Sequence, residues 1–416
     1  MRILFLTHGY PPHDLGGLTL RCQETVNAMR ARGHACHVLT SRYGVDEGSR
    51  AQEGITRSLY FQANVNHYQP LDFFLRRPWQ EQANRSALRH ALDAFQPEVA
   101  FVWGLWNLSR GLPYLAEQWM SSERVAYSIA DYWPMEPDIH ETYWCLPAQR
   151  ACTEALKRPI RRVALRMLAR DKRAQPLVLQ NVVCVSQYVR HKLSEAGALP
   201  HGARVIYNGI DPQPFLEAAN MRAASQDTAS LVYVGGLAKH KGVHTAIKAI
   251  SLLKSQGKAD GLHLTIIGSG HPDYEELLKQ HVGVLGLAKN VLFRGRVPRS
   301  KIAEILADQD IFLFTSVYEE PMARTVMEAM AVGLPVIGTA VGGQREMLED
   351  GVNALTFQPD NVAELAERIV QLACDPALRA RLADAGRQTV LERFTLERMV
   401  DEMEKWLETI VAGGAT

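Results

Sequence analysis

The chain lacks several features that would place it in a specialised class. Its 6 cysteines form no Cys-x-x-Cys pair and no zinc-ligand spacing, which favours reduced thiols in a cytoplasmic protein. No segment approaches the ~18 apolar residues that a membrane-spanning helix needs. Lys and Arg number 46 against 45 Asp and Glu, so the charge gives no argument for a nucleic-acid partner. The acidic residues are scattered, with no Asp-x-Asp at a strand end, so neither a bound metal nor a cofactor is expected.

The composition and length are those of a globular protein with two domains. Hydrophobic residues make up 47% of the chain and charged residues 22%, and 416 residues exceed what one core usually serves. The first residues, with an apolar core at 3–6, are expected to form a strand rather than a signal peptide. We predict one domain over 1–200 and a second over 205–395, with a hinge near 196–204.

Apolar strand patterns and helix patterns alternate in both halves of the sequence, which predicts an α/β fold with doubly wound parallel sheets. The helix expected over 18–32 ends at Gly33, and the helix expected over 322–332 ends at Gly333. The predicted strands cover 3–7, 35–40, 99–103, 125–129, 182–186, 231–234, 264–267, 291–294, 311–314 and 335–339.

The most informative segment is 319–330, which reads Glu-Glu-Pro-Met-Ala-Arg-Thr-Val-Met-Glu-Ala-Met. It follows the apolar strand predicted at 311–314, and the pattern predicts a loop over 315–321 before the helix. Free backbone N–H groups and the helix dipole converge where a strand, a loop and a helix N-terminus meet. This segment is therefore expected to bind an anion.

Two carboxylates, Glu320 and Glu328, lie eight positions apart across the start of this helix. At ~1.5 Å per residue, that separation is roughly 12 Å, too far for both to share one reacting atom. They can instead hold opposite ends of an elongated ligand with an anionic middle, such as a nucleotide sugar. An isolated pair of this kind is more often a solvated pair on a surface helix, but the strand and loop before it favour the ligand.

Other candidate residues stand at strand ends or helix starts. Gly16 and Gly17 precede a helix, where glycine lets a phosphate approach the backbone. Lys241 lies beside a glycine at another helix start and is a flexible cation suited to phosphate. Gly268 follows a strand in a Gly-x-Gly pattern, which is a weak signal. Asp131 follows the strand at 125–129, where a side chain faces the ligand crevice or serves as a local cap.

Glu320 and Glu328 match the E-x7-E motif of the retaining family-4 glycosyltransferases, and the chain resembles that family over almost its whole length. The resemblance implies the GT-B fold, two facing Rossmann-like domains with the donor site in the cleft between them. It also implies that Glu320 contacts the donor sugar and that Glu328 holds the ribose. The backbone amides between them would meet the sugar and the diphosphate; these belong to Met322, Ala323, Arg324, Thr325 and Val326.

The same resemblance extends to other segments. The family has Gly-Arg-Leu, three variable residues and Lys-Gly where this chain has 235–242, so Lys241 would hold the diphosphate. Gly16 and Gly17 would face the phosphates, and Gly268 occupies the place of a family glycine. The loop after the strand at 291–294 would read the base, with Arg294, Arg296 and Val297 as candidates, and a surface role for the two arginines stays equally open. The helix at 396–412 would pack back on the first domain.

The chain departs from the family at three places. Gly236 replaces the arginine that helps to hold the diphosphate, so Lys239, an arginine from elsewhere or the helix amides must compensate. Ala130 replaces a histidine near the donor sugar, while Asp131 is kept. Met322 and Ala323 replace Phe-Gly within the motif, and the Cβ at position 323 narrows the space near the sugar.

The resemblance implies a metal-independent transferase that moves a hexose-type sugar, with retention, from a nucleoside-diphosphate sugar to a hydroxyl acceptor. UDP is expected before GDP, and Glu320, Lys241 and Asp131 are the expected catalytic residues. The acceptor stays open between a glycan, a lipid-linked sugar and a small molecule, because acceptor recognition is expected in the segments 44–95 and 135–180, which resemble the family least. Two alternatives stay open: a non-catalytic nucleotide-sugar-binding protein and a sugar-nucleotide epimerase of the same fold.

The basic segment 161–173 predicts a one-sided helix with Ile160, Val163, Ala164, Met167 and Leu168 on its apolar face. Such a helix either packs on its own domain or lies on an anionic membrane surface at the inner face of the membrane. The apolar face has no aromatic residue, and the charge of the whole chain is balanced. Packing on its own domain is therefore the favoured interpretation.

Overall fold

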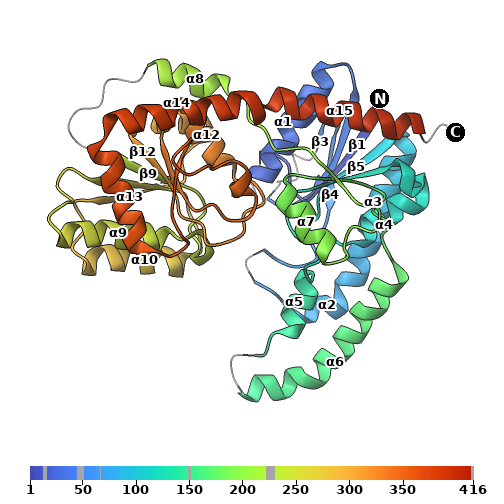
Figure 1. The fold of residues 1–416 in the computed structure, drawn as a ribbon. Coiled ribbons are helices and arrows are strands. Elements are labelled where there is room, and N and C mark those ends of the chain that lie inside the picture. The colour runs from blue at the N-terminus through green and yellow to red at the C-terminus, as the bar shows by residue number, and fades with distance from the viewer. Residues whose placement is uncertain (13–15, 45–50, 66, 149–150, 222–229, 414–416) are drawn as a thin grey trace. The chain divides into compact units, whose positions relative to one another are not determined.

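The computed structural model describes residues 1–12, 16–44, 51–65, 67–148, 151–221 and 230–413. The chain divides into two compact units, shown with all their elements in Figure 1. The N-terminal unit consists of Met1–Val185, Val189–Ile206 and Val400–Thr416, and the C-terminal unit consists of Ser186–Tyr188 and Tyr207–Met399.

The N-terminal unit is built on a sheet with the strand order β3-β4-β2-β1-β5-β6-β7-β8, in which only the β3/β4 pair is antiparallel. All six residues of β5 are buried, as expected for a parallel strand covered on both faces. The strands are β1 (Arg2–Thr7), β2 (Ala35–Ser41), β3 (Ala51–Gln52), β4 (Ile55–Leu59), β5 (Val99–Gly104), β6 (Val125–Ile129), β7 (Asn181–Cys184) and β8 (Arg204–Val205).

Helices cover both faces of this sheet (Figure 1). They are α1 (Gly17–Ala31), α2 (Pro70–Leu75), α3 (Arg77–Phe95), α4 (Gly111–Met120), α5 (Ile139–Cys145), α6 (Ala151–Ala174) and α7 (Gln187–Glu195). The last helix, α15 (Leu396–Gly413), contributes its residues from Val400 onward to this unit. There, Arg32 pairs with Asp401 at 2.5 Å and Glu404 at 2.6 Å. The Trp406 ring meets the ring of Phe101 in the core, with centroids 5.9 Å apart.

The C-terminal unit has a fully parallel sheet with the order β11-β10-β9-β12-β13-β14. Leu231 of β9 pairs with Leu264 of β10 on one side and with Ile311 of β12 on the other. The strands are β9 (Ser230–Val234), β10 (His263–Ile267), β11 (Val291–Gly295), β12 (Ile311–Phe314), β13 (Val336–Gly338) and β14 (Leu355–Thr356).

The helices of this unit lie above and below its sheet (Figure 1), and a large apolar core fills the space between one face of the sheet and the helices that cover it. They are α8 (Gln213–Asn220), α9 (Val243–Ser255), α10 (Pro272–Val284), α11 (Ile302–Ala307), α12 (Arg324–Val332), α13 (Val362–Cys374) and α14 (Pro376–Arg393). Every residue of α12 from Val326 to Val332 is buried, so this helix is a central element of the unit.

The prediction of two doubly wound parallel-sheet domains is confirmed, and each predicted strand is present with its ends shifted by at most two residues. One boundary was wrong in a way that affects the site, because α12 begins at Arg324 and not at 322. Among the helices of the described segments, none has the length and apolar character to cross a bilayer.

Candidate active site

The sheet of the C-terminal unit changes its winding direction between β9 and β12. The chain proceeds from β9 outward to β10 and β11, then returns beside β9 as β12 and proceeds to β13 and β14. Loops that leave two such strands diverge, and ligands of doubly wound folds bind at the carboxyl ends of the strands at this point. The loops at 235–242 and 315–323 leave the sheet here, and five of the predicted site residues lie in them: Gly236, Lys241, Glu320, Met322 and Ala323.

The two loops are fastened to each other by hydrogen bonds. Thr315 Oγ1 donates to the Lys241 carbonyl at 3.0 Å, and the Val317 N–H donates to the His240 carbonyl at 2.9 Å. Gly242 has φ +68°, and a Cβ there would lie 1.9 Å from the Thr315 carbonyl oxygen. The glycine after Lys241 therefore permits this close contact, which holds the lysine beside the second loop.

Lys241 and Glu320 meet at the switch point. The Lys241 ammonium donates to Glu320 Oε1, and Ser316 Oγ donates to the same oxygen at 2.9 Å. Glu320 is 9% exposed and Lys241 is partly exposed, so the pair lies at the edge of the protein interior. A carboxylate with one free oxygen beside a lysine can accept hydrogen bonds from hydroxyls while the ammonium faces an anion.

The start of α12 adds backbone donors to this pair. Ala323 is the N-cap, in an extended conformation, and its side chain cannot accept a hydrogen bond from the first turn. The first N–H groups of any helix lack an acceptor within that helix, and no side chain caps the first turn of α12. The estimate of roughly 12 Å between Glu320 and Glu328 assumed that all eight positions are helical. That assumption was wrong, because Glu320 precedes α12 and the helical rise does not set the distance between the two carboxylates.

Glu328 is fully buried and holds two arginines. Arg299 donates from Nη1 to Oε2 at 2.8 Å and from Nη2 to Oε1, and Arg324 Nε donates to Oε1 at 2.6 Å. Arg299 follows Pro298 in a short 3₁₀ turn after β11, and the sequence analysis did not select it. Two guanidinium groups around one carboxylate leave a net charge of +1 at this place. This charge could replace that of the arginine that the family has at the position of Gly236.

The remaining predicted residues of this unit have different surroundings. Gly236 is exposed, and a Cβ there would meet nothing within 4 Å. Gly268 lies where a Cβ would be 1.8 Å from the Gly235 carbonyl oxygen, so contact between the loops after β9 and β10 explains this glycine without a ligand. Arg294 is exposed on the edge strand β11, and Val297 follows it, half-buried. The Met322 side chain is buried, so only its backbone is available to a ligand.

In the N-terminal unit, the winding direction changes between β1 and β5. His8 follows β1 directly; its N–H donates to the Gly104 carbonyl at 3.1 Å, and its ring meets Trp106 edge-on. Burial lowers the pKa of His8 to about 4, against a smaller opposite effect of the Gly104 carbonyl. The ring is therefore neutral at pH 7, and its Nδ1 has no hydrogen-bond partner among the described residues.

Asp131, Gly16 and Gly17 lie at the same carboxyl edge of this sheet. Asp131 follows β6, and desolvation by the surrounding protein raises its pKa to about 6, opposed by the Trp133 N–H at 3.5 Å. Gly16 is the N-cap of α1 with φ +112°, and Gly17 is the first helical residue. The part of the predicted glycine loop at 13–15 lies outside the described residues.

Aromatic side chains form a row along this edge that the sequence analysis missed. The ring of Trp106, after β5, lies 5.7 Å from that of Phe61, after β4, which lies 5.4 Å from that of Tyr43, after β2. Tyr43 and Trp106 are both exposed. With His8 at its end, the row spans loops from four strands, which only the folded sheet brings together.

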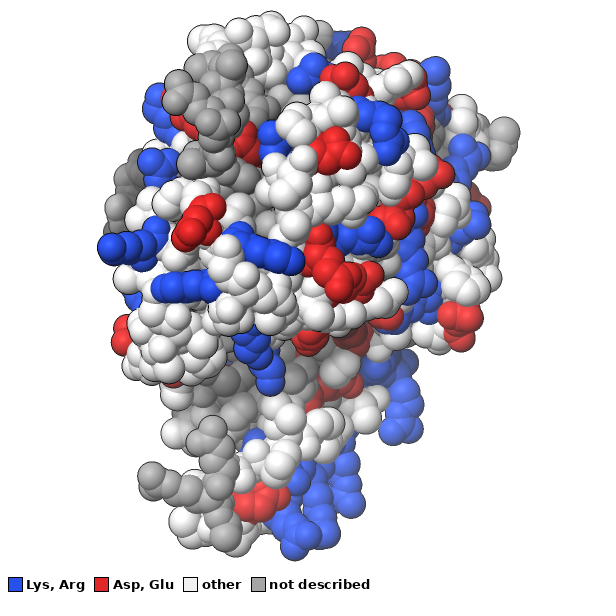
Figure 2. Space-filling model, turned by 60° about the vertical axis from the view of Figure 1, so that its left-hand side comes forward, with Lys and Arg blue, Asp and Glu red and all other residues white. Residues whose placement is uncertain are grey.

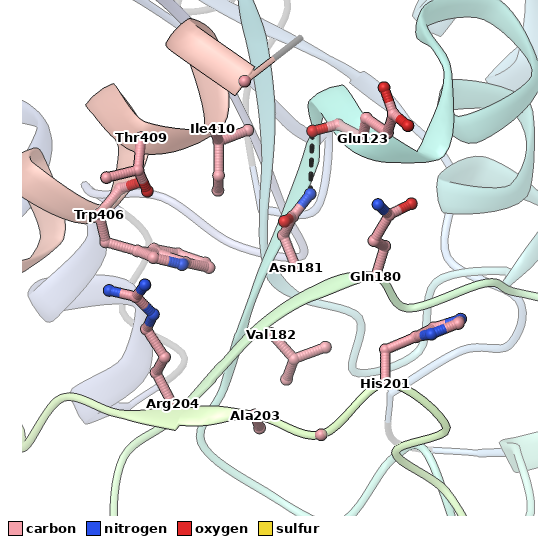
Figure 3. A pocket seen from close by; sticks show the side chains of 12 residues that line it. Glu123, Gln180, Asn181, Val182, His201, Ala203, Arg204, Trp406, Thr409 and Ile410 are labelled. Carbon is pink, nitrogen blue, oxygen red and sulfur yellow. Dashed lines mark hydrogen bonds between the residues drawn. The ribbon is translucent and has the colours of Figure 1, made fainter.

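The cavity in Figure 3 belongs to the N-terminal unit but lies at the opposite edge of the sheet. It measures about 510 Å³, and its lining includes Glu123 before β6, Asn181 at the start of β7 and Arg204 at the start of β8. These are the amino ends of the strands, away from His8 and Asp131. In the described segments, no three His, Cys, Asp or Glu side chains gather as a set of metal ligands.

Comparison with known proteins decides the class. The family described as Glycosyl transferases group 1 matches residues 218–389, and Glycosyltransferase Family 4 matches residues 15–214. The chain belongs to the glycosyltransferases. A glycogen synthase of Mycobacterium tuberculosis is 27% identical over 405 residues, 95% of this chain and 91% of that protein. An uncharacterized glycosyltransferase of Methanocaldococcus jannaschii is 23% identical over 414 residues, 97% of this chain and 96% of that one.

Solved structures agree in fold. The Anabaena protein HepE, in a crystal structure with UDP-glucose, has a TM-score of 0.70 at 21% identity, with 98% of this chain and 100% of that chain covered. The two parallel-sheet domains of this glycosyltransferase are therefore those of the GT-B fold.

Proposed function

We propose that this glycosyltransferase moves a hexose-type sugar from a nucleoside-diphosphate sugar to a hydroxyl acceptor, with retention at the anomeric carbon and without a metal ion. The observation that carries the donor assignment is the contact between Lys241 and Glu320 at the β9/β12 switch point, beside the uncapped start of α12. One cation, one carboxylate and several backbone N–H groups match a ligand that has an anionic diphosphate next to a sugar rich in hydroxyls.

Each part of this arrangement has a role in the departure of the nucleoside diphosphate. As the bond to the sugar breaks, negative charge grows on the phosphate, and Lys241 and the α12 amides stabilise it. Glu320 accepts hydrogen bonds from the sugar hydroxyls and orients the ring. The leaving phosphate takes the proton of the acceptor hydroxyl on the same face of the sugar, which gives retention.

The Glu328 cluster serves the nucleoside end. Its two oxygens accept three N–H bonds from Arg299 and Arg324 and keep capacity for a ribose hydroxyl, since a carboxylate offers about four acceptor sites. The remaining positive charge of the two arginines supplies attraction for the diphosphate that an arginine at Gly236 would otherwise supply. UDP is the first nucleotide to test, because the HepE structure holds UDP-glucose.

We assign the acceptor to the N-terminal unit. The exposed rings of Tyr43 and Trp106 offer flat apolar surfaces, and the row ends at the buried, neutral His8. A sugar ring or another flat acceptor with hydroxyl groups fits this combination.

The first experiment is calorimetric titration of the purified protein with UDP, GDP and ADP in the presence of EDTA. One clear binder, with affinity reduced in Glu328→Gln and not in a surface variant such as Glu276→Gln, supports the proposed donor site. If none of the three binds, the donor assignment fails.

Turnover separates transfer from the two alternatives. A transferase hydrolyses the matching donor slowly without acceptor, and nuclear magnetic resonance of the first sugar product shows the retained anomeric configuration. A protein that only binds leaves the donor intact. An epimerase incorporates deuterium from the solvent into the donor sugar.

A further inference from the structure

The helix α6 (Ala151–Ala174) presents three different faces, and only one of them packs on the protein. Ala164 and Leu168 are buried against Phe73 of α2 and Trp144 of α5. The sequence analysis placed Ile160, Val163 and Met167 on the same face as these two residues, but the structure leaves all three exposed. The apolar residues of the helix are thus divided between a packed face and an unpacked one.

The unpacked apolar face is a continuous stripe. Leu156, Ile160, Val163 and Met167 are 71%, 44%, 52% and 37% exposed. Their spacing of four, three and four residues keeps them on one side of a helix, over a length of roughly 16 Å. A run of large apolar side chains that stays in water in a folded protein marks an interaction surface.

The third face carries the positive charge. Between Ala151 and Ala174 the sequence has 8 Lys and Arg residues against Glu154 and Asp171. Both carboxylates are engaged, Glu154 by Arg161 and Asp171 by Arg77. Within the described segments, Arg158, Arg162, Arg166 and Arg170 have no carboxylate partner. Figure 2 shows Lys and Arg side chains at its lower end, where Figure 1 places α6.

The helix is held firmly enough to present these faces. Lys157 Nζ donates to the Tyr143 carbonyl at 2.7 Å and to the Leu146 carbonyl at 2.8 Å, which ties the first half of α6 to the end of α5. The second half is anchored by Arg77, which bonds Asp171 at 2.5 Å. The stripe and the arginines therefore have fixed positions relative to the N-terminal unit.

We propose that α6 is a docking surface for an anionic lipid bilayer. The apolar stripe enters the boundary between headgroups and acyl chains, and the adjacent arginines bind the lipid phosphates along the same length of helix. Long arginine side chains reach headgroups while their carbon chains stay near apolar surface. The four apolar side chains lie along one side of a single helix, which is the arrangement of helices that lie in a bilayer interface. A second copy of α6 would bring the same four arginines against each other, which like charges oppose.

Vesicle flotation of the full-length protein tests this surface. Binding should be weak to vesicles of phosphatidylcholine alone, increase with the fraction of phosphatidylglycerol and decrease with added salt. Absence of binding to phosphatidylglycerol vesicles at low salt would overturn the proposal.

Two double variants separate the contributions of the two faces. The pair Leu156→Gln with Val163→Gln should weaken vesicle binding about tenfold or more, because two apolar side chains no longer enter the bilayer. The pair Arg162→Glu with Arg166→Glu should weaken it at least tenfold and remove most of the salt dependence. Unchanged binding in either pair would contradict the proposal.

Matched controls come from the C-terminal unit. Leu277→Gln with Val284→Gln changes two exposed apolar residues of α10, and Lys279→Glu with Lys289→Glu reverses two exposed charges. Both controls should bind vesicles like the wild type. The midpoint of thermal unfolding should be unchanged in all four, because none of these side chains is buried. If the α6 variants instead abolish self-association measured by sedimentation without lipid, α6 binds a second copy and the bilayer proposal is wrong.

Discussion

The two units use the same doubly wound architecture, yet they place different chemistry at their switch points. The β9/β12 point in the C-terminal unit carries charged groups held by ion pairs, Lys241 with Glu320 and Glu328 with two arginines. The β1/β5 point in the N-terminal unit carries a neutral histidine and a row of aromatic rings. The fold therefore fixes where a ligand binds, while the loops decide whether that ligand is an anion or a ring.

The comparison is tested most strongly at Lys241. Lys241→Ala should lower kcat/KM for the donor by about 10²- to 10³-fold, because a positioned cation stabilises the leaving diphosphate. Lys239→Ala, which changes an exposed lysine two positions away, is the matched control and should retain near wild-type kinetics.

Trp106→Ala in the N-terminal unit should raise KM for the acceptor about threefold to tenfold and leave nucleotide binding unchanged. Loss of nucleotide affinity in Trp106→Ala would contradict the assignment of the donor to the C-terminal unit and of the acceptor to the N-terminal unit.

The two titratable groups of the N-terminal unit should act on stability in opposite directions. The raised pKa of Asp131, about 6, means that stability is lost as pH rises from 4 to 6, so Asp131→Asn should gain up to about 3 kcal/mol relative to wild type between pH 4 and 7. The lowered pKa of His8, about 4, means that stability is lost as pH falls below 6.5, so His8→Asn should lose a similar amount over the same rise in pH. Denaturant unfolding at several pH values measures the free energy of unfolding of each variant relative to the wild type. If this difference changes with pH in the same direction for both variants, one of the two pKa shifts is wrong.

Within the C-terminal unit, the two glutamates should differ in effect. Glu328→Gln should weaken binding of free nucleoside diphosphate roughly tenfold to a hundredfold, because a hydrogen bond to a charged acceptor is lost and the arginines are no longer neutralised in the same way. Glu320→Gln should mainly lower turnover. Equal calorimetric affinity for the nucleotide in Glu328→Gln and wild type would contradict these roles.

The smallest expected effect concerns Gly236, where the family has an arginine. Gly236 has open space around its Cβ position, so Gly236→Arg should fold normally and increase affinity for the nucleoside diphosphate about fivefold, the equivalent of ~1 kcal/mol. Gly236→Gln adds similar bulk without charge and should leave the affinity unchanged. An arginine that weakens binding would show that Arg299 and Arg324 already fill the space for a second cation.

The sequence predicted much of the fold, and part of the candidate site, for a physical reason. Strand ends and helix starts are local patterns, so the positions of Lys241 and Glu320 could be predicted from alternating apolar segments. Arg299 could not, because it reaches Glu328 from 29 positions earlier in the chain and nothing in its own segment indicates that contact. His8 could have been predicted as Asp131 was, because His8 directly follows the parallel strand β1 and Asp131 follows β6 after one residue.

Two other differences have their own causes. The start of α12 was placed too early because the residues before it suit a first helical turn by propensity, while Ala323 is extended in the folded chain. The faces of α6 could not be separated because apolar residues occupy both, and periodicity alone does not show which one finds a partner.

The last helix has a consequence for the synthesis of this protein. Residues from Val400 onward belong to the N-terminal unit, where Trp406 is buried and Arg32 pairs with Glu404. A ribosome delivers the strands of that unit first, but their final covering emerges only after the whole C-terminal unit has been made. Part of the core of the nascent N-terminal unit therefore stays exposed until the whole C-terminal unit has been synthesised. During this period the unit depends most on chaperones.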